Sequence, residues 1–165
     1  MNHWQDENFW LWVPKNVEKL YHGTDYMIKV KIYTIGRCKD SWLQEALAEY
    51  EKRLSNQVQF EWILAKNDEE LESKLQAPWI ALDPKGELLD SPSLSKKWMK
   101  LVQTHGARLN ILIGGSDGIP KHLLNKSVWN WSLSPLTFTH QMTRLILLEQ
   151  LYRAFEIEMG SEYHK

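Results

Sequence analysis

The sequence predicts an α/β fold, with a mostly parallel β-sheet and helices on both of its faces. Strand-like and helix-like segments alternate from Met27 to the end of the chain. Segments 79–82 and 109–113 are almost wholly apolar, as expected for strands that are buried on both faces. Segment 141–158 carries leucine and aromatic residues at steps of three and four, which is typical of a long helix.

The first strand and the first helix have clear signals. Residues 28–33 alternate strictly between apolar and polar side chains, and the segment stays rich in β-forming residues to Ile35. Asp40 or Ser41 can cap the helix that follows, because apolar residues then recur at helical spacing as far as Leu54.

The next three predicted elements are shorter. Residues 58–64 predict a second strand, and Asn67 can cap a short charged helix that runs through Leu75. Residues 79–82 are the third strand. Residues 83–86 read Asp-Pro-Lys-Gly, which is a turn-forming sequence, so we expect it to end that strand.

The last part of the chain completes the alternation. Ser91 or Ser93 can begin a helix that runs to about Thr104. Residues 109–113 predict the fourth strand and residues 129–134 the fifth. The long helix described above then ends the domain.

Composition fits one ordinary globular domain. The 165 residues are 43% hydrophobic and 25% charged, and this length supports one hydrophobic core rather than two. The formal net charge is -1, so no overall positive field indicates nucleic-acid binding. Binding to RNA therefore requires that Lys and Arg gather on one face, or that a second subunit contributes.

Compartment and the start of the domain can also be predicted. Cys38 is the only cysteine, which excludes an internal disulfide and favours a reducing compartment. No apolar run approaches the roughly 20 residues of a membrane helix, and the first residues do not resemble a signal peptide. We expect a cytoplasmic protein with a folded domain at 27–165, preceded by an aromatic-rich extension at residues 1–26 that is either native or upstream of the true start.

Three strand ends predict the ligand site. Ligands of open parallel sheets bind beyond the carboxyl ends of the strands. The segments at those ends are 83–86, the glycine-rich 114–118 and 133–138, and glycines allow a backbone to approach a ligand closely. The glycines do not form a dinucleotide-binding fingerprint after the first strand, and no phosphate-binding Walker loop is present.

Polar side chains are dense after the fifth strand. A histidine at a helix start, such as His140, serves either as a cap or packing residue or as a base. His140 and Arg144 share a helix face if the helix begins that early. Glu149 and Arg153 stand four apart, as in a surface ion pair.

Several separated motifs, in order, resemble the ribosomal RNA large subunit methyltransferase H family of the SPOUT class over residues 27–165. They are Val30-Lys31-Ile32-Tyr33-Thr34-Ile35-Gly36-Arg37, Glu49-Tyr50-Glu51-Lys52-Arg53, Ile80-Ala81-Leu82-Asp83, Ile113-Gly114-Gly115-Ser116-Asp117-Gly118, Trp131-Ser132-Leu133-Ser134, Leu136-Thr137-Phe138-Thr139-His140-Gln141-Met142-Thr143-Arg144, Glu149-Gln150-Leu151-Tyr152-Arg153-Ala154-Phe155 and Tyr163-His164-Lys165.

The resemblance implies a fold, an activity and partners. The fold would be a SPOUT-type α/β knot, a deep trefoil knot in the carboxy-terminal part of the domain. The protein would be a homodimer with its two cofactor sites near the shared interface. It would use S-adenosylmethionine to methylate N3 of a pseudouridine in helix 69 of 23S rRNA, within assembled ribosomes. No metal is implied.

The resemblance also implies roles for residues. Cofactor contacts would fall on Leu82, Gly114, Leu133, Ser134, Pro135, Leu136, Thr137 and Phe138. We expect His140 or His164 to accept the N3 proton, unless solvent takes it. We expect the carboxy-terminal part of the chain to face RNA, where its cations would bind phosphates and Tyr163 would stack on an extruded base. The residues expected to contact RNA are Arg144, Arg153, Tyr163, His164 and Lys165.

Two departures and two alternatives stay open. The link from Leu64 to Trp79 is short and acidic, where many relatives have a longer, Lys-rich stretch, and residues 1–26 have no counterpart in the family pattern. The first alternative is a SPOUT methyltransferase that acts on another rRNA or tRNA nucleotide. The second is a catalytically idle RNA-binding or ribosome-assembly module.

Overall fold

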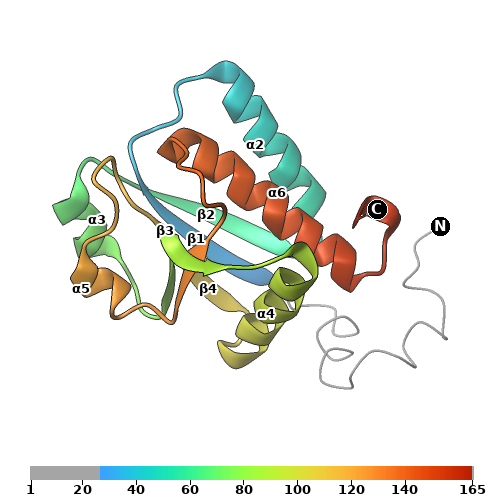
Figure 1. Cartoon of the computed structure of the whole chain (residues 1–165). Helices are drawn as coiled ribbons and strands as arrows, with labels where there is room; N and C mark the ends of the chain where they lie inside the picture. Colours follow the sequence, from blue (N-terminus) through green and yellow to red (C-terminus); the bar gives the residue numbers. More distant parts are fainter. Residues whose placement is uncertain (1–26, 165) are drawn as a thin grey trace.

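A computed structural model describes residues 27–164 and has five parallel strands in one sheet (Figure 1). The sheet order is β2-β1-β4-β3-β5, and every neighbouring pair is parallel. The predicted α/β fold with a parallel sheet is therefore confirmed. The expectations for residues 1–26 lie outside the described residues, and the knot stays a prediction. The strands are β1 (Ile28–Ile35), β2 (Val58–Ala65), β3 (Trp79–Leu88), β4 (Arg108–Ile113) and β5 (Trp129–Ser132).

Helices cover both faces of the sheet, as predicted (Figure 1). On one face α6 packs between α2 and α4. The other face carries α3 and α5, whose Leu71 and Leu123 join a smaller apolar cluster with Tyr33 of β1 and Leu112 of β4. Because side chains alternate along a strand, β1, β2, β3 and β4 each supply both clusters, while β5 supplies only the larger one. The helices are α2 (Ser41–Leu54), α3 (Asp68–Lys74), α4 (Ser91–Thr104), α5 (Lys121–Leu124) and α6 (His140–Glu158), followed by the 3-10 helix η3 (Glu162–His164).

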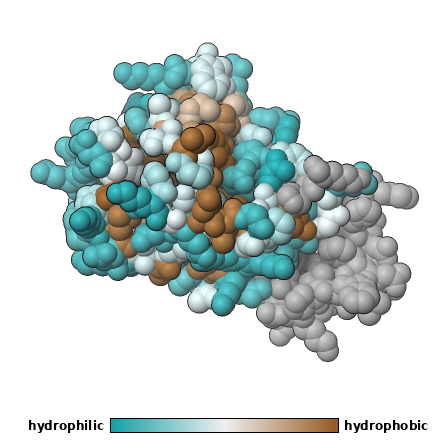
Figure 2. All heavy atoms as spheres, viewed as in Figure 1, coloured by the Kyte–Doolittle hydropathy of each residue, from teal (hydrophilic) through white to brown (hydrophobic). Residues whose placement is uncertain are grey.

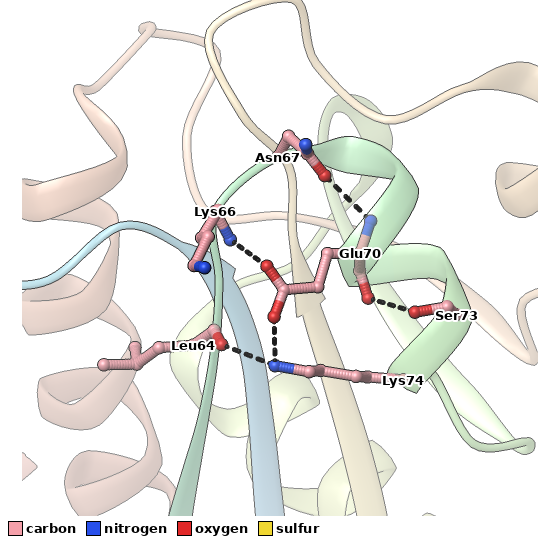
Figure 3. Close-up of polar contacts among 6 residues, drawn as sticks. All are labelled: Leu64, Lys66, Asn67, Glu70, Ser73 and Lys74. Carbon is pink, nitrogen blue, oxygen red and sulfur yellow. Dashed lines mark hydrogen bonds and ion pairs between the residues drawn. The ribbon is translucent and has the colours of Figure 1, made fainter.

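The short link between β2 and β3 forms a tightly capped helix, α3 (Figure 3). Asn67 caps it as predicted, accepting a hydrogen bond from Glu70 N at 2.9 Å. The Glu70 carboxylate reaches back to Lys66 N at 2.8 Å and pairs with Lys74 Nζ at 2.6 Å. Lys74 Nζ also donates to Leu64 O at 3.1 Å. These contacts satisfy the start of the helix and join it to the end of β2.

The helix α4 begins at Ser91, as predicted, and Asp90 caps it by accepting from Ser93 N at 2.8 Å. One predicted boundary was wrong. Residues 83–86 do not end β3: after an irregular stretch the strand pairs again with β5, Glu87 with Trp131. Gly86 permits this close approach, since a Cβ there would lie 2.6 Å from Asn130 O. Other strand and helix ends differ from the predictions by two residues or fewer.

Arg144 joins α6 to the carboxyl end of β1. It is only 2% exposed, and its Nη2 donates to Thr34 Oγ1 at 3.2 Å and to the carbonyl oxygens of Ile35 and Gly36, each at 2.8 Å. Burial lowers the pKa of this guanidinium from its usual value, although arginine stays protonated in proteins. This burial contradicts the expectation that Arg144 faces RNA, because a phosphate would have to enter the core to reach it.

Replacing Arg144 with methionine should destabilise the fold. The variant keeps an unbranched side chain but leaves the three oxygen acceptors of residues 34–36 without their donor. Hydrogen bonds to a charged group contribute about 1.5–3 kcal/mol each, and removal of the buried charge offsets part of that loss. We expect the free energy of unfolding, measured by urea denaturation, to fall by about 2–4 kcal/mol.

The matched control is Arg108→Met, which removes an exposed arginine at the start of β4. Its free energy of unfolding should change by about 0.5 kcal/mol or less. If both variants unfold at the same urea concentration, the Arg144 hydrogen bonds do not hold α6 to β1.

Candidate active site

The carboxyl ends of β4, β3 and β5 meet around one cleft. These strands are neighbours in the sheet, so their exit segments lie side by side. The cleft has a volume of about 540 Å³, which is the size of a small-molecule or cofactor site. Figure 2 shows apolar residues gathered in a band down the middle of this face of the molecule, over the segment between β5 and α6. An apolar wall with a few polar groups is typical of a ligand site.

The cleft brings together most of the residues expected to hold a cofactor. Those that line it are Leu82, Gly114, Leu133, Ser134, Leu136, Thr137 and Phe138. Pro135 is the one expected residue that does not line it. His140, expected as a base, lines it too. The predicted strand-end segments 83–86 and 114–118 also contribute Asp83, Pro84, Gly115, Ser116 and Gly118 to the lining. Residues outside the three predicted segments that line the cleft are Ile113, Ile119, Trp131, Thr139 and Thr143.

The glycine-rich turn after β4 forms one wall and needs its glycines. Gly118 N donates to Gly115 O at 3.1 Å, and Gly118 has a φ of +82°. A Cβ on Gly114 would lie 2.8 Å from Gly118 C and 2.8 Å from the Ile119 side chain. The turn can therefore close only around glycine at position 114, and it presents backbone to the cleft.

The segment from β5 to α6 forms the opposite wall. Ser132 Oγ donates to Pro84 O at 3.1 Å and to Ser134 O at 3.0 Å, which joins this wall to the segment after β3. Ser134 Oγ accepts from Leu136 N at 3.0 Å. Leu136 is 70% exposed. The wall is thus fixed near β5, while an apolar side chain at its rim is open to solvent.

Two titratable side chains line the cleft among the described residues, Asp83 and His140. One Asp83 oxygen accepts from Lys85 N at 3.0 Å. His140 is the first residue of α6, and its neighbour Thr139 caps the helix by accepting from Met142 N at 3.3 Å. His140 is therefore not the cap. It is half-buried at the cleft wall, where it can exchange a proton with a bound molecule.

The residues expected to face RNA lie elsewhere. Arg153 donates to Glu149 Oε1 through Nε at 3.1 Å and Nη2 at 2.6 Å, and its guanidinium lies 4.8 Å from the Tyr163 ring. From His140 to Arg153 the helix rises roughly 20 Å. Arg153 and Tyr163 are therefore far from the cleft of their own chain. The His164 side chain and Lys165 lie outside the described residues.

Within residues 27–164, no group of three or more His, Cys, Asp or Glu is placed to hold a metal ion. In the same part of the chain, none of the helices combines the length and apolar character needed to cross a membrane.

The sequence is similar to known proteins over the whole described domain. A family described as "Predicted SPOUT methyltransferase" matches residues 28–164. The chain is 45% identical over 141 residues to "Ribosomal RNA large subunit methyltransferase H" of Protochlamydia amoebophila (strain UWE25), which covers 84% of this chain and 100% of the relative. It is 35% identical over 159 residues to a protein of the same name from Acetivibrio thermocellus, again covering 84% and 100%.

Glu149, Arg153 and Tyr163 form a cluster on the second half of α6, and the surroundings of Tyr163 predict a raised pKa for its phenol. Burial, followed by a hydrogen bond with Tyr50, raises the pKa of Tyr163 to about 12. The fold therefore favours the neutral phenol. Its contribution to stability is complete below pH 10, the usual tyrosine pKa, and is lost as the pH rises from 10 to 12.

Ultraviolet difference titration of the wild type against Tyr163→Phe measures this pKa directly. The phenolate signal that the variant lacks should appear near pH 12. If the signal that Tyr163→Phe lacks is instead centred on pH 10, Tyr163 is not enclosed by this cluster.

Proposed function

Because this chain belongs to the SPOUT methyltransferase family, we propose that it transfers a methyl group from S-adenosylmethionine to ribosomal RNA of the large subunit. We further propose that the target is N3 of a pseudouridine in helix 69 of 23S rRNA, within assembled ribosomes. The observation that carries the proposal is the meeting of the three expected strand ends around one cleft of about 540 Å³.

The residues of the cleft fit this methyl donor. Leu133, Leu136 and Phe138 offer apolar surface for the adenine ring. The turn at Gly114 is too tight for a side chain, so its backbone groups can approach a base or ribose closely. Among the described residues of the lining, Asp83 alone carries a carboxylate, and it can bind a ribose hydroxyl or the amino group of the donor.

The chain mainly contributes alignment. When bound, S-adenosylmethionine supplies a methyl group that is already activated on a sulfonium. Walls on both sides of the cleft can hold donor and RNA in line, and such positioning can lower a barrier by roughly 7–11 kcal/mol. The imide N3 must lose a proton. His140 is our candidate to accept it because this residue lines the cleft; His164 remains the second candidate.

We also propose a cytoplasmic homodimer with a knotted domain at 27–165. The exposed Leu136 at the rim of the cleft is apolar surface that a second copy would cover. A dimer also suits the position of Arg153 and Tyr163, which are too far along α6 to serve the cleft of their own chain.

Methyl incorporation tests the activity. The protein with labelled S-adenosylmethionine should methylate purified ribosomes faster than free rRNA, and mapping should place the label on one pseudouridine of helix 69. Incorporation only into tRNA would contradict the rRNA assignment while leaving a methyltransferase. Absence of donor binding by calorimetry would favour an idle RNA-binding module.

The same assay separates the two histidines. Loss of a general base lowers a rate by about 10²–10⁴-fold, so His140→Ala should do so while donor affinity is kept. If His140→Ala methylates at the wild-type rate, His140 is not the base, and the same comparison applies to His164→Ala.

Gly114→Ala tests the donor site. An added Cβ would meet backbone at 2.8 Å, so the turn must open and the cleft wall must move. We expect the affinity for S-adenosylmethionine, measured by calorimetry, to fall at least about tenfold, which corresponds to roughly 1.4 kcal/mol.

The control is Gly106→Ala, at a positive-φ glycine outside the cleft with open space around it. It should lower stability by about 1–2 kcal/mol, the cost of a Cβ in the left-handed region, and leave donor affinity unchanged. If Gly114→Ala binds the donor as tightly as the wild type, the turn at 114–118 is not part of the donor site.

A further inference from the structure

The loop between β1 and α2 is held unusually firmly. Four successive backbone carbonyls, of residues 35–38, each accept a hydrogen bond from a side chain of α6 or α2. The donors are Arg144 to Ile35 and Gly36 (2.8 Å each), Gln141 to Arg37 (3.1 Å) and Gln44 to Cys38 (2.8 Å). Most surface loops leave such groups to water and are mobile. This loop therefore has a defined position relative to both helices.

Residues 37–42 of this loop and the start of α2, called the corner below, expose charged and aromatic side chains. Arg37 and Lys39 are exposed, and among the described residues neither side chain takes part in an ion pair or a hydrogen bond. Trp42, in the first turn of α2, is 55% exposed. Proteins bind single-stranded RNA with cationic side chains that contact phosphates and with aromatic rings that stack on unpaired bases. Asp40 is the one acidic residue within the segment, so its net charge stays positive.

Several other cations of the domain are neutralised by neighbours. Ion pairs join Lys31 to Glu61, Arg53 to Glu49, Lys74 to Glu70, Lys97 to Glu87 and Arg153 to Glu149. These pairs cancel charge locally. Arg37 and Lys39 are not paired in this way. Unlike other unpaired cations, such as Lys29 and Lys52, they lie on a loop whose backbone is held by side chains of α6 and α2.

The corner adjoins the cleft. Ile35 precedes it, and the Ile35 side chain lies 2.9 Å from the position that a Cβ on Gly115 would take. Gln141, which holds Arg37, directly follows His140 of the cleft wall. Figure 1 shows the chain leaving β1 and passing the start of α6 on its way to α2. RNA whose target base enters the cleft can therefore reach this corner.

We propose that residues 37–42 form an RNA-binding corner, in which Arg37 and Lys39 bind phosphates of the strand next to the target nucleotide and Trp42 stacks on an unpaired base. This inference rests on the proposed rRNA methylation. Arg144 and Gln141 are positioning residues for the corner, because they hold its backbone rather than touch RNA. The same α6 segment thus places one side of the cleft and the adjacent RNA contact.

The test compares Arg37→Gln/Lys39→Gln with a control that removes the same charges elsewhere. The control is Lys29→Gln/Arg108→Gln. These two exposed residues are neighbours in register at the amino ends of β1 and β4, away from the cleft at the carboxyl ends of the strands. The readouts are the KM and kcat for methylation of purified ribosomes and the salt dependence of ribosome binding. Donor affinity is measured separately by calorimetry.

For Arg37→Gln/Lys39→Gln we expect KM to rise at least about tenfold, with kcat within about twofold and donor affinity unchanged. Each phosphate contact to a single strand contributes about 0.7 to the slope of log K against log salt, so the slope should fall by about 1.4. Trp42→Ala should weaken ribosome binding about tenfold and Trp42→Phe much less, as expected for stacking. The control double variant should resemble the wild type.

Three outcomes would overturn the proposal. One is an unchanged KM and salt slope in Arg37→Gln/Lys39→Gln, or equal losses in the control. Another is a changed sedimentation coefficient in Trp42→Ala, which would make this surface a contact between copies of the chain. Both leave methylation by the wild type intact. If instead the wild type binds the donor but methylates no ribosomes, the proposed function fails and this inference with it.

Discussion

The buried guanidinium of Arg144 is the interaction on which the arrangement of this site depends. It brings a positive charge into a core with only neutral oxygens as partners, at Thr34, Ile35 and Gly36. Burying a charge is costly unless hydrogen bonds compensate for lost water. The three hydrogen bonds that its Nη2 makes also fix the start of α6 against the end of β1, and the start of α6 is a wall of the cleft. The buried guanidinium of Arg144 therefore fixes the position of the cleft wall that the start of α6 forms.

The two ends of α6 have different surroundings as a result. Its first turn faces the cleft, while its last turns carry Glu149 and Arg153 beside Tyr163, a cluster whose hydrogen-bonding groups satisfy one another. Because that cluster is paired internally, its charge has little reach into solvent. A role for it in RNA binding requires an RNA or a second protein copy that rearranges or approaches it. The resemblance places cofactor sites near a dimer interface, which agrees with a cluster that is remote from its own cleft.

Much of this fold could be predicted from the sequence, because alternation and helical spacing locate the elements and strand ends locate a ligand site. The position of Arg144 differs from the prediction because a cation on a helix is expected to face solvent, whereas this one is buried. The signal was present: Arg144 stands three, four and seven residues before Leu147, Leu148 and Leu151, on the stripe that α6 buries. Residues 83–86 were misread because Pro and Gly indicate a turn, whereas here the backbone pairs again after an irregularity that local sequence does not encode. The single-turn α5 has too few residues to show a period.

Net charge was also a poor guide to the surface, for a physical reason. A sum of -1 treats every charge as equal, yet a lysine that is paired with a carboxylate contributes almost nothing to the field at an RNA backbone. What matters is which cations lack partners and whether the backbone that carries them is fixed. At the corner after β1 both conditions hold, since Arg144, Gln141 and Gln44 bind the loop carbonyls and leave Arg37 and Lys39 outward. A nearly neutral chain can thus present a local, preorganised positive surface beside its cleft, and preorganisation lowers the entropy that binding would otherwise cost.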